Sequence, residues 1–246
     1  MTQIIILAAG KGTRMDSDLP KVLVPLNGRP MIKYLMDALL ASGSNARPII
    51  VVSPDNQEII SHALLDYQAD YVVQAEQLGT GQAVACAVPQ LQPGTDHVVV
   101  LYGDHPFLKP DSIRRFISLE QPAVTIMPTV LPDFSDWRQN FYHWGRIVRG
   151  EGGRVERIVE FKDASEAEKL ITEVNPGFMS FNRRWLEENI SRLRNDNKQA
   201  EYYLTDLIKL AFDGGYPVGT TAISPEEAMG INSRQELEAA ASLLRT

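Results

Sequence analysis

A glycine-rich segment near the N-terminus combines small residues with basic side chains. It reads Leu7-Ala8-Ala9-Gly10-Lys11-Gly12-Thr13-Arg14-Met15, and Leu19-Pro20-Lys21 follows shortly after it. Small residues let a backbone approach a phosphate closely, and free amides in such a turn form a concavity that binds anions. Arg14 and Lys21 can add positive charge. The segment therefore indicates a phosphate site, with an ordinary strand-to-helix turn carrying solvated basic residues as the alternative.

Two other phosphate-binding motifs do not fit this segment. Gly10 is not followed at the required spacing by the Gly-Lys-Ser/Thr of a P-loop. Met15 stands where the last glycine of Gly-x-Gly-x-x-Gly would be. ATPase and dehydrogenase functions therefore lose support.

Asp104 offers a carboxylate where a ligand of an α/β sheet would bind. It follows the apolar run from His97 to Leu101, and doubly wound sheets bind ligands beyond the carboxyl ends of their strands. Mg²⁺ usually takes one or two protein oxygens and completes its shell with phosphates and water. By itself Asp104 reads equally well as a turn residue in a surface loop, and Asn232 as a helix N-cap.

These residues need a sheet to position them. Short apolar, β-branched runs predict strands at Ile4 to Leu7, Pro48 to Val52, Tyr71 to Val73 and His97 to Leu101. Helical spacing of apolar residues predicts helices at Met31 to Ala41 and Ile59 to Leu65. This βαβ alternation predicts an α/β fold built on a doubly wound, mostly parallel sheet.

The second half of the chain has a mixed pattern. A strand is predicted at Ala123 to Met127, and a proline- and aromatic-bearing stretch then runs to Trp144. The pair Gly152-Gly153 predicts a hairpin between Arg146 to Arg149 and Val155 to Val159. Such a segment commonly forms a lid or a second substrate pocket. A closing helix is predicted at Ser233 to Leu244.

Composition limits the possible partners and setting. The 246 residues carry a formal net charge of -7, which argues against the clustered basic surface that binds nucleic acid. The one cysteine, Cys86, lies in a small apolar run, which predicts a core thiol in a reducing cytoplasm. The run Ile4 to Ala9 is too short for a membrane span. We expect a cytoplasmic protein without membrane or nucleic-acid partners, and the sequence does not indicate its oligomeric state.

The glycine-rich segment with Leu19-Pro20-Lys21 resembles the signature of the sugar-nucleotide pyrophosphorylases. Further along, the chain resembles the members of that family that transfer a uridylyl group to N-acetylglucosamine-1-phosphate. The matching motifs, which span nearly the whole chain in order, are Gln74-Ala75-Glu76-Gln77-Leu78-Gly79-Thr80-Gly81, Tyr102-Gly103-Asp104, Gly145-Arg146-Ile147, Glu160-Phe161-Lys162-Asp163-Ala164, Asn175, Glu201-Tyr202-Tyr203-Leu204-Thr205-Asp206 and Asn232.

The resemblance implies one Rossmann-like domain of the nucleotide-diphospho-sugar transferase type over residues 1–246. Its nucleotide-binding lobe would cover about 1–104 and its smaller sugar-binding lobe about 105–232, with the closing helix at about 233–246. It also implies site residues. Nucleotide-binding residues would be Leu7, Ala8, Ala9, Gly10, Lys21, Gln74, Gly79 and Thr80. Sugar-binding residues would be Tyr102, Gly103, Gly145, Glu160 and Asn175. Catalytic residues would be Arg14, Lys21 and Asp104, with Asp104 and Asn232 holding Mg²⁺.

Some of these roles also have a physical reason. A buried amide such as that of Gln74 can pair with both a donor and an acceptor on a pyrimidine edge. Without the resemblance, Thr80 would be a polar helix start, Glu160 a solvated charge and Asn175 a turn residue.

The implied activity makes UDP-N-acetylglucosamine and pyrophosphate from UTP and N-acetylglucosamine-1-phosphate by in-line attack, without a covalent enzyme intermediate. No general base is needed, so the four histidines, His62, His97, His105 and His143, are predicted to be non-catalytic. Two alternatives stay open: transfer to another sugar-1-phosphate or other phosphate acceptor, and a non-catalytic protein that binds nucleotide sugars. No hexapeptide repeat follows Asn232, so we expect no use of acetyl-CoA.

Two departures from the family pattern affect the sugar pocket. Asn175 is followed by Pro176, where the family has a small hydroxyl residue, and proline removes a donor and restricts the residue before it. The segment from Leu131 to Trp144 is also longer and more aromatic than the family pattern. Its rings could stack on a sugar or pack a lid.

Overall fold

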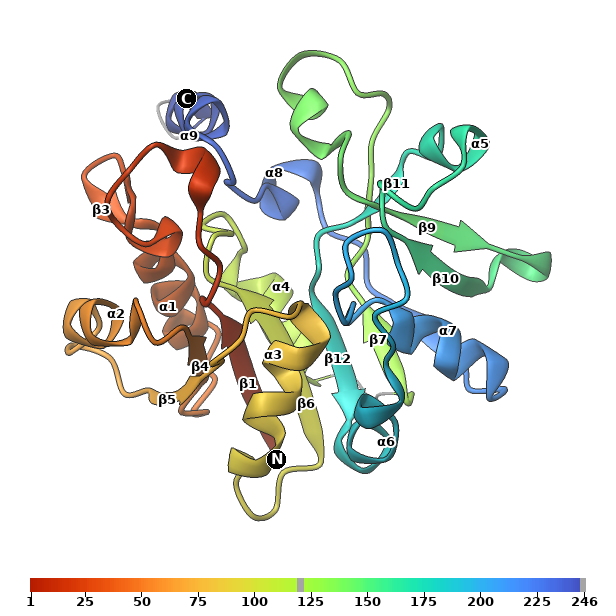
Figure 1. Ribbon diagram of the computed structural model, residues 1–246, viewed down its shortest axis with the longest axis horizontal. Helices are drawn as coiled ribbons and strands as arrows, with labels where there is room; N and C mark the ends of the chain where they lie inside the picture. Colours follow the sequence, from red (N-terminus) through yellow and green to blue (C-terminus); the bar gives the residue numbers. More distant parts are fainter. Residues whose placement is uncertain (119–121, 244–246) are drawn as a thin grey trace.

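A seven-stranded sheet forms the centre of the computed structural model, which describes residues 1–118 and 122–243 (Figure 1). Its strand order is β13-β7-β12-β6-β1-β4-β5. The strands are β1 (Thr2–Leu7), β4 (Ile49–Val52), β5 (Asp70–Val73), β6 (His97–Tyr102), β7 (Val124–Ile126), β12 (Met179–Asn182) and β13 (Val218–Thr220). Neighbours pair in parallel except β12, which is antiparallel to both β6 and β7. The predicted doubly wound, mostly parallel α/β fold is confirmed.

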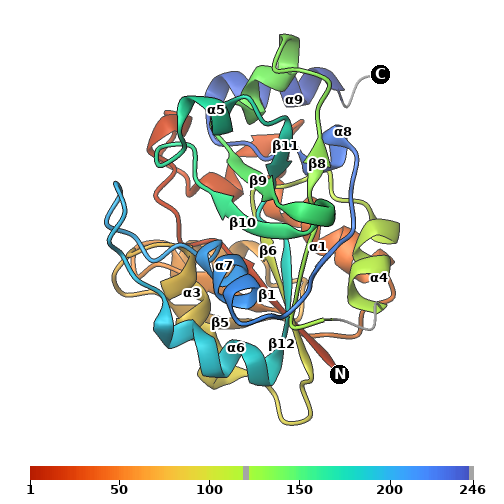
Figure 2. The same ribbon diagram turned by 90° about the vertical axis from the view of Figure 1, so that its right-hand side faces the viewer.

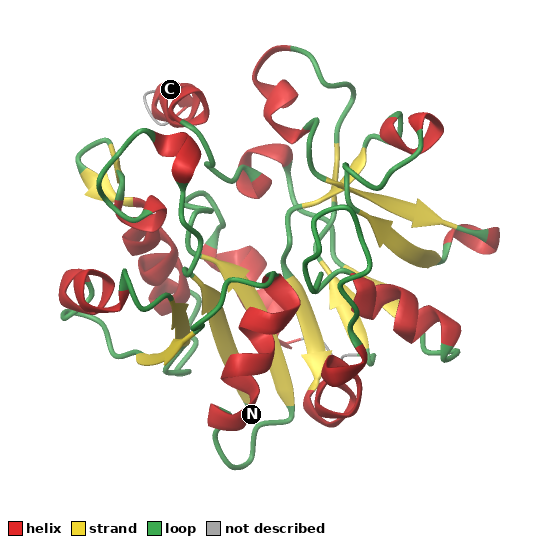
Figure 3. Cartoon of the chain, in the orientation of Figure 1, coloured by secondary structure: helices red, strands yellow, loops and turns green. Residues whose placement is uncertain are grey.

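Helices cover both faces of this sheet (Figure 3). One face packs against α1 (Met31–Ala41), α2 (Gln57–Ala63) and α4 (Pro110–Ser118), and α9 (Arg234–Leu243) joins the edge of the same core, where it contacts residues 25–26. The other face packs against α3 (Thr80–Ala87), α6 (Arg183–Asn189) and α7 (Asp206–Asp213). Alternate strand residues point to opposite faces, so Ile4 and Ile6 join the first core, whereas Ile5 and Leu7 join the second.

Most of the predicted elements are confirmed at or near their expected bounds. The predicted helix Met31 to Ala41 coincides with α1, and the predicted strands fall on β1, β4, β5, β6 and β7. The closing helix is α9, although Leu244 to Thr246 lie outside the described residues. Cys86 is only partly buried on α3, so its predicted core position was wrong. The neighbouring Ala83, Val84 and Ala87 occupy the buried face of that helix instead.

A second, four-stranded sheet has the order β10-β9-β11-β8 and lies above the first in the view of Figure 2. Its strands are β8 (Thr129–Val130), β9 (Gly145–Arg149), β10 (Val155–Val159) and β11 (Glu173–Asn175), and β9 and β10 form the predicted hairpin. The remaining elements are the small β2 (Pro25–Leu26) and β3 (Arg29–Pro30) pair and the short helices α5 (Glu166–Lys169) and α8 (Pro225–Ala228). The region 105–232 thus supplies this sheet and also β7, β12 and β13 of the first.

Arg146 holds the second sheet to the aromatic segment that precedes it. Its side chain is fully buried and donates hydrogen bonds to the backbone carbonyls of Tyr142, Trp144 and Lys169. Its guanidinium also lies 4.8 Å from the ring centroid of Phe134. Burial lowers the pKa of this guanidinium, which carbonyl oxygens and ring faces surround. Phe134 and Tyr142 of segment 131–144 therefore pack against a buried cation.

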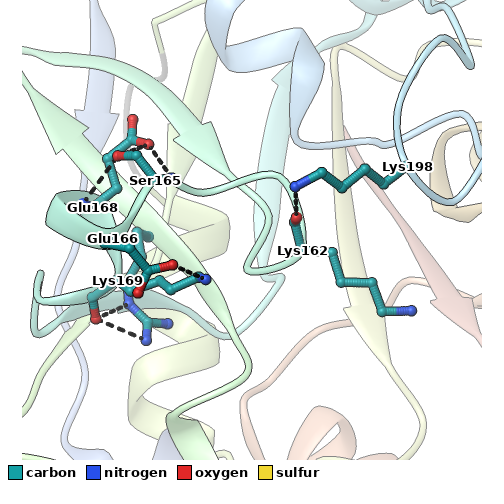
Figure 4. Close-up of polar contacts among 7 residues, drawn as sticks. Lys162, Ser165, Glu166, Glu168, Lys169 and Lys198 are labelled. Carbon is teal, nitrogen blue, oxygen red and sulfur yellow. Dashed lines mark hydrogen bonds and ion pairs between the residues drawn. The ribbon is translucent and has the colours of Figure 1, made fainter.

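Reciprocal capping fixes α5, whose last carbonyl Arg146 contacts (Figure 4). The Ser165 hydroxyl accepts from the Glu168 amide at 3.3 Å, and the Glu168 carboxylate accepts from the Ser165 amide at 2.8 Å. In the same view, the Lys198 ammonium donates to the Lys162 carbonyl and ties the loop before α7 to the loop after β10. These local bonds stiffen the lobe around the second sheet.

None of the helices in the described residues combines the length and the apolar character that a membrane span requires.

We predict that Arg146→Met lowers the free energy of unfolding by about 3 kcal/mol, because several carbonyl acceptors lose their donor. The measurement is urea denaturation followed by circular dichroism. The matched control is Arg184→Met, which removes an exposed arginine paired with Glu188 and should change stability by no more than about 0.5 kcal/mol. Equal losses in the two variants would contradict the packing role of Arg146.

Candidate active site

Two adjoining cavities open at the edge where β1, β4 and β6 end. The register sets Leu7 of β1 level with Val51 of β4 and Tyr102 of β6, so the loops after these strands meet. The first cavity, of about 550 Å³, is lined by the glycine-rich turn and by Gln74, and the second, of about 390 Å³, by residues of the second sheet. The residues that line both are Lys21, Thr80, Tyr102, Asp104 and Glu201.

Two side chains fix the glycine-rich turn from outside the motif. The Asn56 amide donates to the carbonyl of Ala8 at 3.0 Å, and the Gln77 amide donates to the carbonyl of Ala9 at 2.7 Å. Because the carbonyl and the amide hydrogen of a trans peptide point in opposite directions, the turn's amides remain directed away from these contacts. Leu7, Ala8, Ala9 and Gly10 all line the first cavity, as predicted for a phosphate-binding turn.

Gly12 allows this turn to lie against Lys21. Its φ is 62°, and a Cβ there would come within 2.6 Å of the Lys21 Cβ. A larger residue would therefore clash and adopt a strained backbone conformation. Lys21 begins the short turn Lys21–Leu23, in which Val22 and Leu23 are buried. Lys21 is therefore positioned by its close approach to Gly12 and by the buried residues Val22 and Leu23 that follow it.

Gln74, Gly79 and Thr80 meet on the far wall of the first cavity. The buried Gln74 amide donates to the Gly79 carbonyl at 3.1 Å and to Gln82, so its own carbonyl oxygen remains as an acceptor. Thr80 is the first residue of α3, and its hydroxyl accepts from the Leu204 amide at 3.1 Å. The hydroxyl therefore links α3 to the loop before α7 and does not cap the helix.

Asp104 is buried, at 5% exposure, and is not the surface carboxylate that its turn sequence suggested. One oxygen accepts from the ammonium of Lys21, and the other lies 3.0 Å from His105 Nδ1. The same ammonium donates to the Asn232 side-chain oxygen at 3.0 Å. Burial opposes ionisation, but the charge of Lys21 and the contact with His105 outweigh it and hold the pKa of Asp104 below its ordinary value.

Asn232 reaches this site because a neighbour caps the closing helix. The Ser233 hydroxyl accepts from the Glu236 amide at 3.2 Å, and the Glu236 carboxylate accepts from the Asn232 amide. The alternative reading of Asn232 as the N-cap is therefore excluded. A backbone bond of 3.0 Å from the Ile231 amide to the Asp104 carbonyl fixes the two segments side by side.

The donor set suits a magnesium ion. Carboxylate and amide oxygens from Asp104 and Asn232 converge on one cation, the ammonium of Lys21, and both are ligand types that Mg²⁺ prefers. Within the described residues, no group of three or more His, Cys, Asp or Glu side chains could hold a metal by itself. The two oxygens therefore fit a metal whose remaining ligands are substrate phosphates and water.

The second cavity brings together Tyr102, Gly145, Glu160 and Asn175. Thr205 donates to Glu160 at 2.9 Å. Burial raises the pKa of Glu160, and the nearby Asp206, Asp163 and Glu201 raise it further, against the effect of the Thr205 hydrogen bond. Glu160 is thus a partly buried acceptor in the cavity wall, in surroundings that disfavour its charged form.

Asn175, Pro176 and Gly177 form a turn that a hydrogen bond from the Gly177 amide to the Asn175 side chain closes. The Asn175 carbonyl oxygen accepts from the Gly177 amide at 3.1 Å, so its NH₂ group remains as a donor in the cavity wall. Gly177 has a φ of 101°, and a Cβ there would lie 2.5 Å from the Tyr102 ring. The ring and the turn therefore pack tightly against each other.

Two predicted site residues lie differently from the rest. Arg14 is exposed and lines the second cavity, away from the turn amides of the first. Gly103 lines neither cavity, because it packs below the site: a Cβ there would lie 2.9 Å from Val22 Cγ1. Its contribution is close packing under Asp104.

Several residues around the site carried no assigned role in the sequence. Asn56 and Gln77 hold the turn, Thr205 and Tyr203 lie beside Glu160, and Trp144 lines the second cavity. Thr205 and Tyr203 belong to the run 201–206, whose match to the family pattern was a signal for them. Asn56 offered no local signal, because a lone amide before a helix resembles any capping residue.

This geometry defines the class of protein, a nucleotidyltransferase. The chain belongs to the MobA-like NTP transferase domain family, which matches residues 4–198. It is 40% identical over 245 residues to the bifunctional protein GlmU of Brevibacillus brevis, which covers 98% of this chain and 51% of that protein. It is 43% identical over 238 residues to GlmU of Alcanivorax borkumensis and of Bordetella petrii, covering 95% of this chain and 50% of each relative. The chain spans about half the length of these relatives.

We predict that Asp206→Asn flattens the dependence of stability on pH. Burial, together with Asp163 and Asp196, raises the pKa of Asp206 from 3.8 to about 6 in the folded protein. The folded state therefore retains a proton between these values that the unfolded state loses, and the free energy of unfolding falls as pH rises through this window. Above pH 6, the variant should be more stable than the parent protein.

Urea denaturation at pH 4, 5, 6 and 7.5 measures this effect. The control is Asp213→Asn, at the exposed end of the same helix, where Asp213 pairs with Lys209. That variant should keep the slope of the parent protein. An unchanged slope in Asp206→Asn would show that this carboxyl does not retain its proton.

Proposed function

We propose that this chain transfers a uridylyl group from UTP to N-acetylglucosamine-1-phosphate and forms UDP-N-acetylglucosamine and pyrophosphate, with Mg²⁺ as cofactor. The observation that carries the proposal is the place of Lys21 and Asp104 in the walls of both cavities. A nucleotidyl group that moves from a nucleotide in one cavity to a sugar phosphate in the other must cross the boundary between the two cavities, where Lys21 and Asp104 lie. The family motifs support the choice of uridine and of this sugar, and the lone, unpaired Cys86 is consistent with a cytoplasmic setting.

The proposed reaction needs positioning more than acid–base chemistry. A phosphate oxygen of the sugar phosphate attacks the α-phosphorus of the nucleotide, a new O–P bond forms, and the bond to the leaving pyrophosphate breaks. In the turn from Leu7 to Gly10, the amides of Ala9 and Gly10 hold the nucleotide phosphates, since the Ala8 amide already donates to the Val51 carbonyl. Lys21 and Arg14 offset the negative charge that would keep two phosphates apart. Mg²⁺, when bound by Asp104 and Asn232, adds charge neutralisation on the phosphate oxygens.

The walls of the cavities supply specificity in this proposal. In this proposal the side-chain carbonyl oxygen of Gln74, with the Gly79 and Thr80 backbone, reads a donor on the pyrimidine edge, because its NH₂ group already donates to Gly79 and Gln82. Glu160 accepts hydrogen bonds from sugar hydroxyls in the second cavity, and the free NH₂ group of Asn175 donates to the acetamide carbonyl. The nucleotide-binding lobe at about 1–104 and the sugar-binding lobe at about 105–232 remain part of the proposal.

A pyrophosphate-release assay with four nucleotides and three sugar phosphates tests this function. We expect turnover with UTP and at least about tenfold higher kcat/KM for N-acetylglucosamine-1-phosphate than for glucose-1-phosphate or galactose-1-phosphate, about 1.4 kcal/mol from the acetamide contact. Equal use of an unacetylated sugar would refute the sugar assignment and leave uridylyl transfer standing. Binding of UDP-sugars without any turnover would support the non-catalytic alternative.

We predict that Asp104→Asn reduces turnover by roughly a thousandfold, about 4 kcal/mol, because a neutral amide binds a metal more weakly than a carboxylate does. The variant keeps the shape of the side chain, so circular dichroism should show an intact fold. The control is Asp111→Asn on α4, whose side chain is 84% exposed, and it should retain full activity. Near-normal magnesium-dependent turnover in Asp104→Asn would exclude the metal assignment.

A further inference from the structure

Lys21 stands where the proposed metal would bind. Its ammonium donates to the Asp104 carboxylate and, at 3.0 Å, to the Asn232 oxygen, which are the two oxygens assigned to Mg²⁺. Its side chain is 18% exposed and that of Asp104 is 7% exposed, so little water screens this pair. The lysine therefore already neutralises the carboxylate on which a metal would depend.

The two oxygens are held together independently of the lysine. The backbone bond from Ile231 to Asp104 joins their segments, and the Glu236 carboxylate fixes the amide of Asn232. His105 contacts the other oxygen of Asp104 at 3.0 Å and leaves the shared side to Lys21. Removing the lysine side chain would therefore leave a preformed site of two oxygens in the wall of the second cavity, with Asp104 also lining the first.

A divalent cation and the ammonium cannot share this position. Two cations a few ångströms apart repel each other, most strongly where the surroundings are poor in water. Lys21 also lines the first cavity, where the phosphates of a nucleotide would offer its ammonium another anionic partner. The ammonium of Lys21 could therefore pair with these phosphates when it leaves the two oxygens.

We propose that the ammonium of Lys21 is the resident cation of the Asp104–Asn232 pair and that a divalent metal must displace it to bind. This inference deepens the proposed function and rests on its assignment of the metal to these two residues. Lys21 accordingly lowers the affinity of the empty enzyme for metal alone. A metal that arrives with nucleotide phosphates meets a smaller barrier, because those phosphates accept the displaced ammonium.

Binding of Mn²⁺, a paramagnetic substitute for Mg²⁺, to the nucleotide-free full chain tests the proposal. Electron paramagnetic resonance of free Mn²⁺ gives the dissociation constant. Lys21→Met removes the charge and keeps a side chain of similar reach, and we expect it to bind Mn²⁺ at least about tenfold more tightly than the parent protein, about 1.4 kcal/mol. Lys21→Ala should behave in the same way if the methionine variant fails to fold.

Two controls separate displacement from a general change of charge. Lys11→Met removes another lysine of the first cavity that does not contact the oxygen pair, and it should leave Mn²⁺ affinity within about twofold of the parent value. The double variant Lys21→Met with Asp104→Asn should lose the gained affinity. Equal affinity in the parent protein and Lys21→Met, or an equal gain in Lys11→Met, would overturn the proposal.

These measurements need neither UTP nor a sugar phosphate. A failure of uridylyl transfer in the activity assay would therefore leave the result for Lys21 intact, and an unchanged Mn²⁺ affinity in the Lys21 variants would leave the proposed reaction intact.

Discussion

The buried carboxylate of Asp104 needs a positive partner, and this need organises the site. A charge removed from water is costly unless it is paired and hydrogen-bonded. Lys21 lies in the N-terminal loop, 83 residues before Asp104. Asn232 lies in the segment before the last helix, 211 residues after Lys21. The contact therefore draws three distant parts of the chain to one edge of the sheet. A cation that enters this edge meets the ammonium of Lys21, which already contacts both oxygens.

The sheet can hold such a contact because it is packed on both faces. Alternate residues of β1 enter two separate cores, one against α1, α2 and α4 and the other against α3, α6 and α7. Parallel strands with the same direction end at the same edge, so the loops after Leu7 and Tyr102 start from fixed positions. The sheet edge thus fixes where the loops that carry the site residues begin.

The second sheet supports the second cavity. Arg146 contacts the aromatic segment 131–144 from within: Phe134 and Tyr142 pack on each other and on the guanidinium, and Phe141 packs on Trp144. The rings could stack on a sugar or pack the lobe, and the contacts of most of these rings are packing contacts. Trp144 also lines the cavity beside Gly145 and Asn175. Trp144 thus forms part of the wall of the second cavity, while the interior of segment 131–144 packs against Arg146.

The sequence by itself determined the periodic parts of this protein: β1, β4, β6, the full extent of α1 and the turn that follows β1, because apolar spacing and small residues are local signals. It also supplied motif positions that line the two cavities. Only the tertiary structure decided the contacts between them. The antiparallel entry of β12 beside β6, the hold of Asn56 on the turn and the bridge from Lys21 to Asn232 join residues far apart in sequence. Local patterns carry no record of such pairings, since they arise from packing of the whole chain.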